Sequence, residues 1–147
     1  MADLTIDSAF RGKFMSEAVV TNLISTRLYP RGNVPQVPTK PYATYQRITT
    51  DNNHHMRAAS GLQVVDFQID CVCETYPEVI ALADAFRNAA DGFRGTVTIG
   101  LDSLTLRQCH LDNQTDAPIN PTDGGETGTF VINQDWSVGA VIAAPTL

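Results

Sequence analysis

The sequence predicts an α+β fold in which an antiparallel, partly mixed β-sheet carries two helices packed on one face. The first observation is an alternating apolar and polar segment, residues 61–74, that leads directly into a segment with helical spacing of apolar residues. The second is a series of further strand-like segments separated by turn residues. Read in order, the elements are α-β-β-α-β-β-β, and we expect all 147 residues to form one domain.

A strand with one apolar face is predicted in the middle of the chain. Residues 61–74 read GLQVVDFQIDCVCE. Successive side chains on a strand point to opposite faces of the sheet, so one face is apolar and the other mostly polar. The apolar face holds Val65, Phe67, Ile69, Cys71 and Cys73.

A helix is predicted directly after this strand. Thr75 and Glu78 have the spacing of a capping box, and Pro77 is compatible with a first helical turn. Gly92 is a typical helix stop. Apolar residues recur between these signals at helical spacing, namely Val79, Ile80, Leu82, Ala83, Phe86 and Ala90. We expect this helix to cover the apolar face of the strand.

The N-terminal region predicts an amphipathic helix over residues 8–26, followed by an extended crossing. Apolar residues step by three and four through this helix, and Gly12 weakens its start, so regular helix is expected from nearer Phe14. The crossing, residues 28–41, contains four prolines and one glycine, which exclude regular helix and an inner strand.

The remaining strands and loops follow from turn residues and alternation. Two polar stretches, Thr50–Ser60 and Asn113–Gly128, are read as long loops, which in compact domains are either functional or disordered. The apolar tail from Gly139 is expected to pack on this subunit or on a neighbour. The other predicted strands are residues 42–49, 95–100, 104–111 and 129–138.

Charge is unevenly distributed along the chain. The net charge of −6 argues against a nucleic-acid-binding surface spread over the whole molecule. Residues 27–57 carry Arg27, Arg31, Lys40, Arg47 and Arg57 against one acidic residue, Asp51. After Gln108 the charged residues are all acidic: Asp112, Asp116, Asp123, Glu126 and Asp135. These are either solvated loops or the two ends of a dipolar subunit that meet in an assembly.

The three cysteines and the N-terminus indicate a reducing cytoplasm. Cys71 and Cys73 are two apart on one strand and cannot form a relaxed disulfide, and the total is odd. The first residues, MADLTID, lack the pattern of an export signal. No apolar run approaches the roughly 20 residues that a membrane helix needs.

Patterns that carry chemistry are weak in this sequence. The candidate metal ligands lack the spacing of a zinc site: His54, His55, His110, Cys71, Cys73 and Cys109. Cys109 and His110 are adjacent, so on a strand they point to opposite faces and form no catalytic dyad. The pair Asp66 and Asp70 is best explained as a solvated sheet face. Because no hydrolase, kinase or nucleotide-binding motif is present either, we expect no metal, no cofactor and no enzymatic activity.

Two segments together resemble a known family. Residues 27–49 read RLYPRGNVPQVPTKPYATYQRIT, and residues 64–97 read VVDFQIDCVCETYPEVIALADAFRNAADGFRGTV. Their order is similar to that of the tail completion, or tail terminator, proteins of long-tailed phages and prophages. The resemblance covers about the first two-thirds of the chain. It is carried by Leu28, Tyr29, Pro30, Val34, Pro35, Gln36, Pro41, Tyr45, Gln46, Arg47, Ile48, Phe67, Gln68, Ile69, Asp70, Cys71, Thr75, Tyr76, Ala81, Leu82, Ala83, Ala85, Arg87, Asp91 and Gly92.

This resemblance implies a structural virion protein without an active site. The whole chain would be one tail-terminator-like domain that forms a homo-oligomer, a hexameric ring on the head-proximal end of the tail tube. The ring would stop tube polymerisation and offer the head–tail joining surface. The implied partners are the tail tube protein and a head-closure or connector protein, with no membrane and no sequence-specific nucleic acid, although DNA would pass through the lumen.

The implied location is the tail–neck junction of the virion, after assembly in the cytoplasm of a host bacterium. Two alternatives remain open at this point. One is a head-closure or neck adaptor protein of the head–tail connector, and the other is a small cytoplasmic enzyme or binding module.

Charged residues are the candidates for the subunit or partner interface. A ring that closes on itself needs two unlike surfaces at its seam, and the basic and acidic regions of this chain could supply them. The predicted interface residues are Arg31, Arg47, His54, His55, Arg57, Asp116, Asp123 and Glu126.

Overall fold

The computed structural model describes residues 5–36, 38–54, 59–116 and 130–141, and of residues 51–54 and 59–62 only the backbone. In order, the elements of these residues are α1 (Ile6–Met15), α2 (Ala18–Ile24), β1 (Leu28–Pro30), β2 (Tyr42–His54), β3 (Ala59–Cys73), α3 (Tyr76–Ala90), β4 (Gly95–Ile99), β5 (Asp102–Asp116) and β6 (Phe130–Val141).

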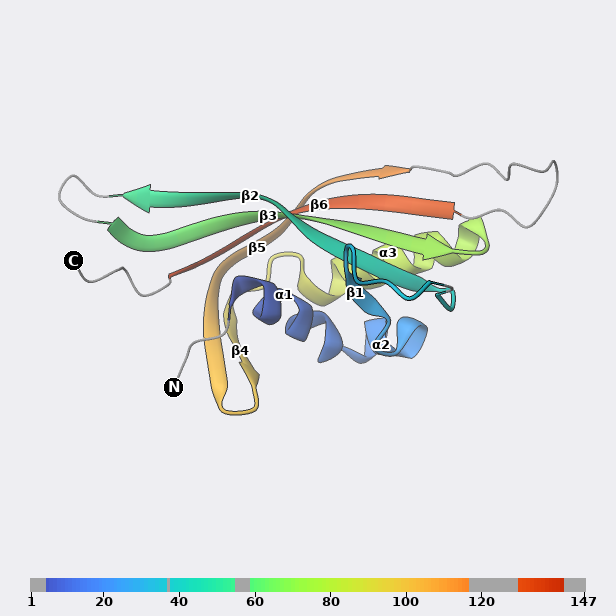
Figure 1. The fold of residues 1–147 in the computed structure, drawn as a ribbon, viewed down its shortest axis with the longest axis horizontal. Coiled ribbons are helices and arrows are strands. Elements are labelled where there is room, and N and C mark those ends of the chain that lie inside the picture. The colour runs from blue at the N-terminus through green and yellow to red at the C-terminus, as the bar shows by residue number, and fades with distance from the viewer. Residues whose placement is uncertain (1–4, 37, 55–58, 117–129, 142–147) are drawn as a thin grey trace.

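The strands form one mixed, strongly twisted sheet with the helices on one side (Figure 1). Their order in the sheet is β1-β2-β3-β6-β5-β4. The pair β1–β2 is parallel, and the other four pairs are antiparallel. The predicted α+β class, the mixed sheet and the placement of helices on one face are therefore confirmed.

The predicted N-terminal helix is two helices, and it begins earlier than expected. Thr5 caps α1 by accepting a hydrogen bond from the Ser8 backbone N–H (3.1 Å). Gly12 lies inside α1, so the expected start near Phe14 is wrong. A Cβ atom at Gly12 would lie 2.7 Å from Ile99 Cδ1, which shows that the glycine lets α1 approach β4 closely. The first helix ends at Met15. Glu17 has an extended backbone and is the N-cap residue of α2.

The crossing and the polar stretches contain more strand than expected. β1 lies within the crossing as a short strand at the sheet edge, where a proline such as Pro30 is tolerated. β2 continues to His54, β3 begins at Ala59 and β5 continues to Asp116, so both predicted loops are wrong where they overlap these strands. The end of β5, from Asp112 to Asp116, is exposed, which suits its polar residues. The rest of each stretch lies outside the described residues.

The core lies between the helices and the sheet and is centred on aromatic rings. The apolar face of β3 is buried as predicted, from Val65 to Cys73. Phe10 stacks on Phe67 with ring centroids 4.6 Å apart, and Phe14 meets Trp136 edge-on at 5.5 Å. None of the helices in the described part of the chain has the length and apolar character needed to cross a membrane.

We expect Thr75→Ala to lower the free energy of unfolding by about 1 kcal/mol. Thr75 Oγ1 accepts a hydrogen bond from the Glu78 backbone N–H (3.3 Å), which would otherwise lack a partner at the start of α3. Thr75→Ser keeps the acceptor and serves as the control. Urea unfolding monitored by circular dichroism measures both variants, and equal stability of the two would contradict the capping role.

Candidate functional site

One face of the sheet carries polar side chains, and none of the helices in the described residues covers it (Figure 1). On β3 and β6 the buried residues Phe67, Ile69 and Trp136 point to the helices, so their neighbours in sequence point the other way. Cross-strand pairing places Asp66 beside Ser137 and Gln68 beside Asp135. We call this surface the polar sheet face and define it as Thr44, Gln46, Asp66, Gln68, Asp70, Asn133, Asp135 and Ser137.

Asp66 on this surface and Asp112, at the adjacent bulge of β5, share one hydroxyl group. Ser137 Oγ lies 3.1 Å from Asp66 Oδ1 and also makes a short contact with Asp112 Oδ2. Thr49 Oγ1 donates a second hydrogen bond to Asp66, to Oδ2 at 2.7 Å. Because the serine has a single proton, it can donate to only one of the two carboxylates at a time. One of the two carboxylates is therefore always without the hydrogen bond from Ser137.

A third carboxylate, Asp70, has a raised pKa. Burial is the main cause, and the nearby negative charge of Asp135 adds to it. Arg31, which lies 4.0 Å from Asp70, and a hydrogen bond from Gln68 Nε2 at 3.2 Å oppose this rise. The Arg31 side chain is 56% exposed, so this cation at the edge of the polar sheet face compensates Asp70 only weakly.

Asp66, Asp112 and Asp135 line a shallow hollow of about 380 Å³. Carboxylates at such a surface repel phosphate groups and attract cations. Among the described residues, no group of three or more His, Cys, Asp or Glu side chains is arranged to hold a metal ion. The hollow is lined by Ile48, Asp66, Phe67, Asp112, Asp135, Trp136 and Ser137.

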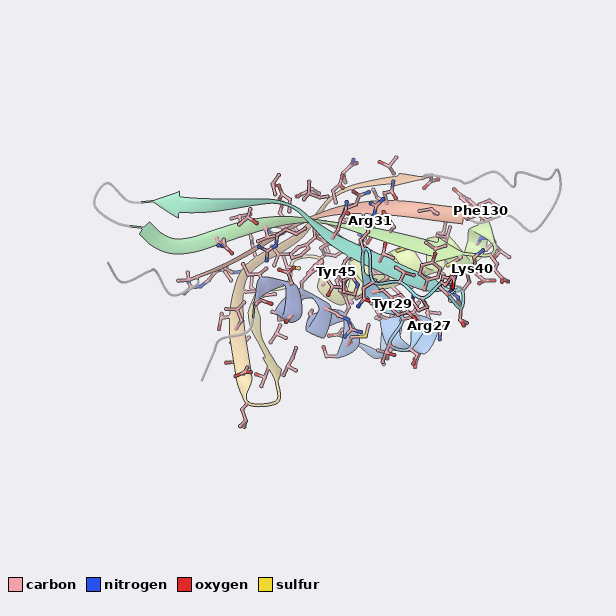
Figure 2. All side chains as sticks on the ribbon, in the orientation of Figure 1. Arg27, Tyr29, Arg31, Lys40, Tyr45 and Phe130 are labelled. Atoms are coloured by element: carbon pink, nitrogen blue, oxygen red, sulfur yellow. The ribbon has the colours of Figure 1, made fainter. Side chains whose placement is uncertain are left out.

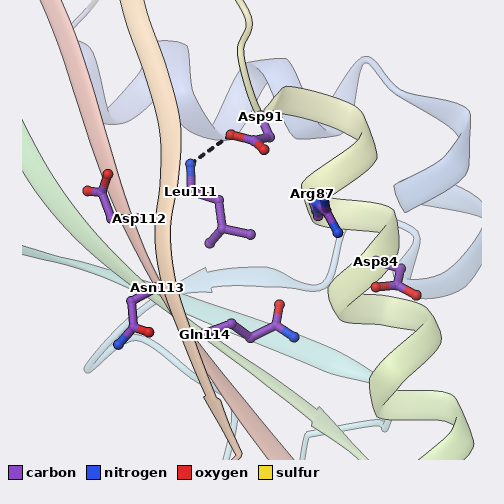
Figure 3. Close-up of a pocket in the computed structure, with 7 residues that line it drawn as sticks. All are labelled: Asp84, Arg87, Asp91, Leu111, Asp112, Asn113 and Gln114. Atoms are coloured by element: carbon purple, nitrogen blue, oxygen red, sulfur yellow. Dashed lines mark hydrogen bonds between the residues drawn. The ribbon is translucent and has the colours of Figure 1, made fainter.

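A second hollow, of about 370 Å³, lies between α3 and the edge of β5 (Figure 3). The end of α3 is tied to this edge by two hydrogen bonds. The Leu111 N–H donates to Asp91 Oδ1 (3.0 Å), and the Gly92 N–H donates to the Cys109 carbonyl oxygen (2.7 Å). We call this hollow the α3 groove and define it as Asp84, Arg87, Asp91, Leu111, Asp112, Asn113 and Gln114.

A buried glutamine holds α3, β5 and β6 together. Gln134 is fully buried, and its Nε2 donates to the Ala83 carbonyl oxygen and to Gln114 Oε1, both at 2.9 Å. Its Oε1 accepts from Trp136 Nε1 at 3.1 Å. The sequence shows Gln134 only as an interruption of an apolar face, and nothing local to it identifies these partners.

The residues predicted for an interface fall into separate groups. Arg31, labelled in Figure 2, is exposed beside the polar sheet face, whereas Arg47 forms an ion pair with Asp7 and so connects β2 to the start of α1. Asp116 ends β5 and accepts a hydrogen bond from the Tyr76 hydroxyl (3.0 Å). His54 ends β2, but its side chain lies outside the described residues, as do His55, Arg57, Asp123 and Glu126.

All three cysteines are buried free thiols with raised pKa values. Burial raises the pKa of Cys73 and of Cys109 to about 12, with further contributions from Glu78 and Asp91 respectively. The pKa of Cys71 is also well above its usual range because the thiol is buried. The raised pKa values disfavour the thiolate at physiological pH, which is the form of cysteine that acts as a nucleophile.

We expect none of the three thiols to react with Ellman's reagent in the native protein at pH 8, and all three to react after unfolding in urea. The raised pKa values also predict that stability decreases with alkaline pH. Their contribution is complete below the pKa of an unfolded thiol, about 8.5, and is lost as the pH rises towards 12. Rapid stoichiometric reaction of any thiol with Ellman's reagent in the native protein would contradict the predicted lack of reactivity.

Comparison with known proteins places this fold and sequence among virion components. One matching solved structure is a chain described as "Virion of native gene transfer agent (GTA) particle", with a TM-score of 0.69 and 16% identity. The match covers 90% of this chain and 92% of that chain, and at this identity it shows a shared fold. No curated protein sequence matches.

The family model for "Tail completion protein gp17" matches residues 8–117, which is most of the chain and includes both segments that carry the sequence resemblance. The chain therefore belongs to the tail completion protein gp17 family and is a phage tail structural protein.

Proposed function

We propose that this chain is the subunit of a ring, hexameric as in the family it resembles, that caps the head-proximal end of the tail tube. The ring stops tube polymerisation and presents the surface that joins the tail to the head connector. The observation that carries this proposal is the polar sheet face of a tail structural protein, uncovered by helices and rich in carboxylates. The function is performed by surface contact, without catalysis.

The polar sheet face suits the lumen of such a ring. Double-stranded DNA carries one negative charge per about 1.7 Å of its axis. A surface with Asp66, Asp112 and Asp135 repels this charge, so DNA can pass through without adhering. The helices then lie on the outside of the ring, because they cover the other face of the sheet (Figure 1).

The two ends of β5 differ, as contact with two different partners requires. The tip of the β4–β5 hairpin lies at the start of β5. At this tip Leu101 is 84% exposed and Ile99 is 44% exposed. At its last residue, Asp116, lies an apolar hollow of about 210 Å³ that is also lined by Tyr76, Val79, Phe130 and Val131. We assign one end to the tail tube protein and the other to the head connector.

Loss of the chain from the phage tests the assignment to the tail end. In negative-stain electron micrographs of the deletion mutant, we expect tail tubes of uncontrolled length that are not joined to heads. Tails of normal length, detached from full heads, would contradict the capping role and favour a neck adaptor instead.

Asp135→Lys tests the lumen. We expect this variant to assemble normal virions that eject their DNA slowly, because the introduced cations attract phosphate. Asp135→Asn removes the negative charge without adding a positive one, and it should change ejection far less. Equal ejection rates for wild type and Asp135→Lys in assembled virions would place this face away from the DNA.

A further inference from the structure

We propose that neighbouring copies in the ring join edge to edge, with β2 of one copy pairing antiparallel with β5 of the next. This inference rests on the proposed function and names the seam that the ring requires. Its partner is a second copy of this chain.

Both strands have an edge segment that no strand in the described residues occupies. On the side away from β3, β2 pairs with β1 only at Ala43 to Tyr45, which leaves the edge open from Gln46 onward. On the side away from β6, β5 pairs with β4 only from Asp102 to Leu106. Asp91 and Gly92, at the end of α3, form hydrogen bonds with this edge as far as Leu111. The β5 edge is therefore open from Asp112 to Asp116. Open edges present backbone donors and acceptors to an incoming strand.

The strand directions make the two edges complementary. The pairs β2–β3, β3–β6 and β6–β5 are all antiparallel, so β2 and β5 run in opposite directions at opposite sides of this four-stranded part. When β5 of one copy lies beside β2 of the next, the new pair is again antiparallel. The same contact can then repeat from copy to copy, and such a repeat of unlike surfaces forms a ring when the rotation between copies closes.

A β-bulge lies at each open edge. Ile48 is skipped in the β2–β3 register and Asp112 in the β5–β6 register. Bulges increase local twist and bend a strand, which is the curvature that a sheet needs in order to close. Ile48 is 49% exposed, an apolar side chain that a neighbouring strand would cover.

The α3 groove beside the β5 edge has the charge to receive β2. It contains three carboxylates, Asp84, Asp91 and Asp112, against one cation, Arg87. The incoming edge, residues 46–50, reads QRITT; it brings no carboxylate, and its one cation, Arg47, forms an ion pair with Asp7 of its own chain. In addition, every residue of β5 from Asp112 to Asp116 is exposed, although it belongs to a paired strand. A neighbouring copy would cover this segment.

Site-directed cross-linking tests this seam. The variants are Ile48→Cys, Thr115→Cys and the combination of both, and each is treated with a short bismaleimide. Both positions are exposed and make no side-chain hydrogen bond in the described structure, and the three native thiols are buried. The double variant should give a ladder of covalent oligomers on denaturing gels, whereas an equimolar mixture of the two single variants should stop at dimers. Each single variant alone should stay uncross-linked.

The controls separate failure of the seam from failure of the ring. Ile48→Cys combined with Asn22→Cys, an exposed position on α2, should give no ladder. Native mass spectrometry measures the oligomer in parallel. An oligomer whose double variant does not cross-link would overturn the β2–β5 seam but leave the ring, and a chain that is monomeric even with tail tube protein would overturn both. Cross-linked dimers from one single variant alone would indicate a two-fold contact and also overturn the seam.

Discussion

Phe14→Ala is expected to lower the free energy of unfolding by about 3–5 kcal/mol. Phe14 is fully buried at the centre of the aromatic core. Its ring lies 4.9 Å from that of Phe10, 4.7 Å from Phe86 and 5.5 Å from Trp136, all edge-on. Truncation to alanine leaves a cavity between α1, α3 and β6, and loses both burial and the favourable ring geometry.

The single tryptophan of the chain, Trp136, reports this change directly. It is buried beside Phe14, so its fluorescence follows global unfolding in urea. Val19→Ala, on the exposed side of α2, is the control and should stay within about 1 kcal/mol of wild type. A loss of less than about 1 kcal/mol for Phe14→Ala would show that Phe14 lies outside the core.

Gln134→Leu is expected to cost about 2–4 kcal/mol, although leucine is apolar and of similar size. The substitution leaves the buried Trp136 N–H without its acceptor and removes the donor to the Ala83 carbonyl oxygen. Each buried polar group that loses its partner costs about 1–3 kcal/mol. Gln114→Ala removes only the partly exposed member of the network and should cost less.

A double-mutant cycle isolates the hydrogen bond between Gln134 and Trp136. Trp136→Phe removes the N–H and keeps an aromatic ring, and circular dichroism replaces fluorescence as the readout. We expect the double variant with Gln134→Leu to be less destabilised than the sum of the single variants, by about 1–3 kcal/mol. Additive effects would mean that the two side chains act independently.

Elements with local signals are predicted well from this sequence. The alternation of β3 gives its buried face, and the cap at Thr75 and the glycine at Gly92 delimit α3 to within a residue or two. These signals depend on residues close in the chain, so the sequence alone reveals them.

Features that depend on distant residues are not predicted. Gln134 is buried because Ala83 and Gln114 supply partners from two other elements. Gly12 is a packing contact with β4 rather than a weak helix start. The ion-pair partner of Arg47 is Asp7, which is far from it in sequence. The open edges of β2 and β5 follow from the order of strands in the sheet, which no local pattern specifies.

The mass of the purified chain in solution, alone and with tail tube protein, tests most directly whether it is a ring-forming cap. We predict a single closed species whose mass is a fixed multiple of the 16.0 kDa chain, formed by the chain alone or on addition of tail tube protein, and bound to tube ends. A monomer of 16.0 kDa under both conditions would contradict the account.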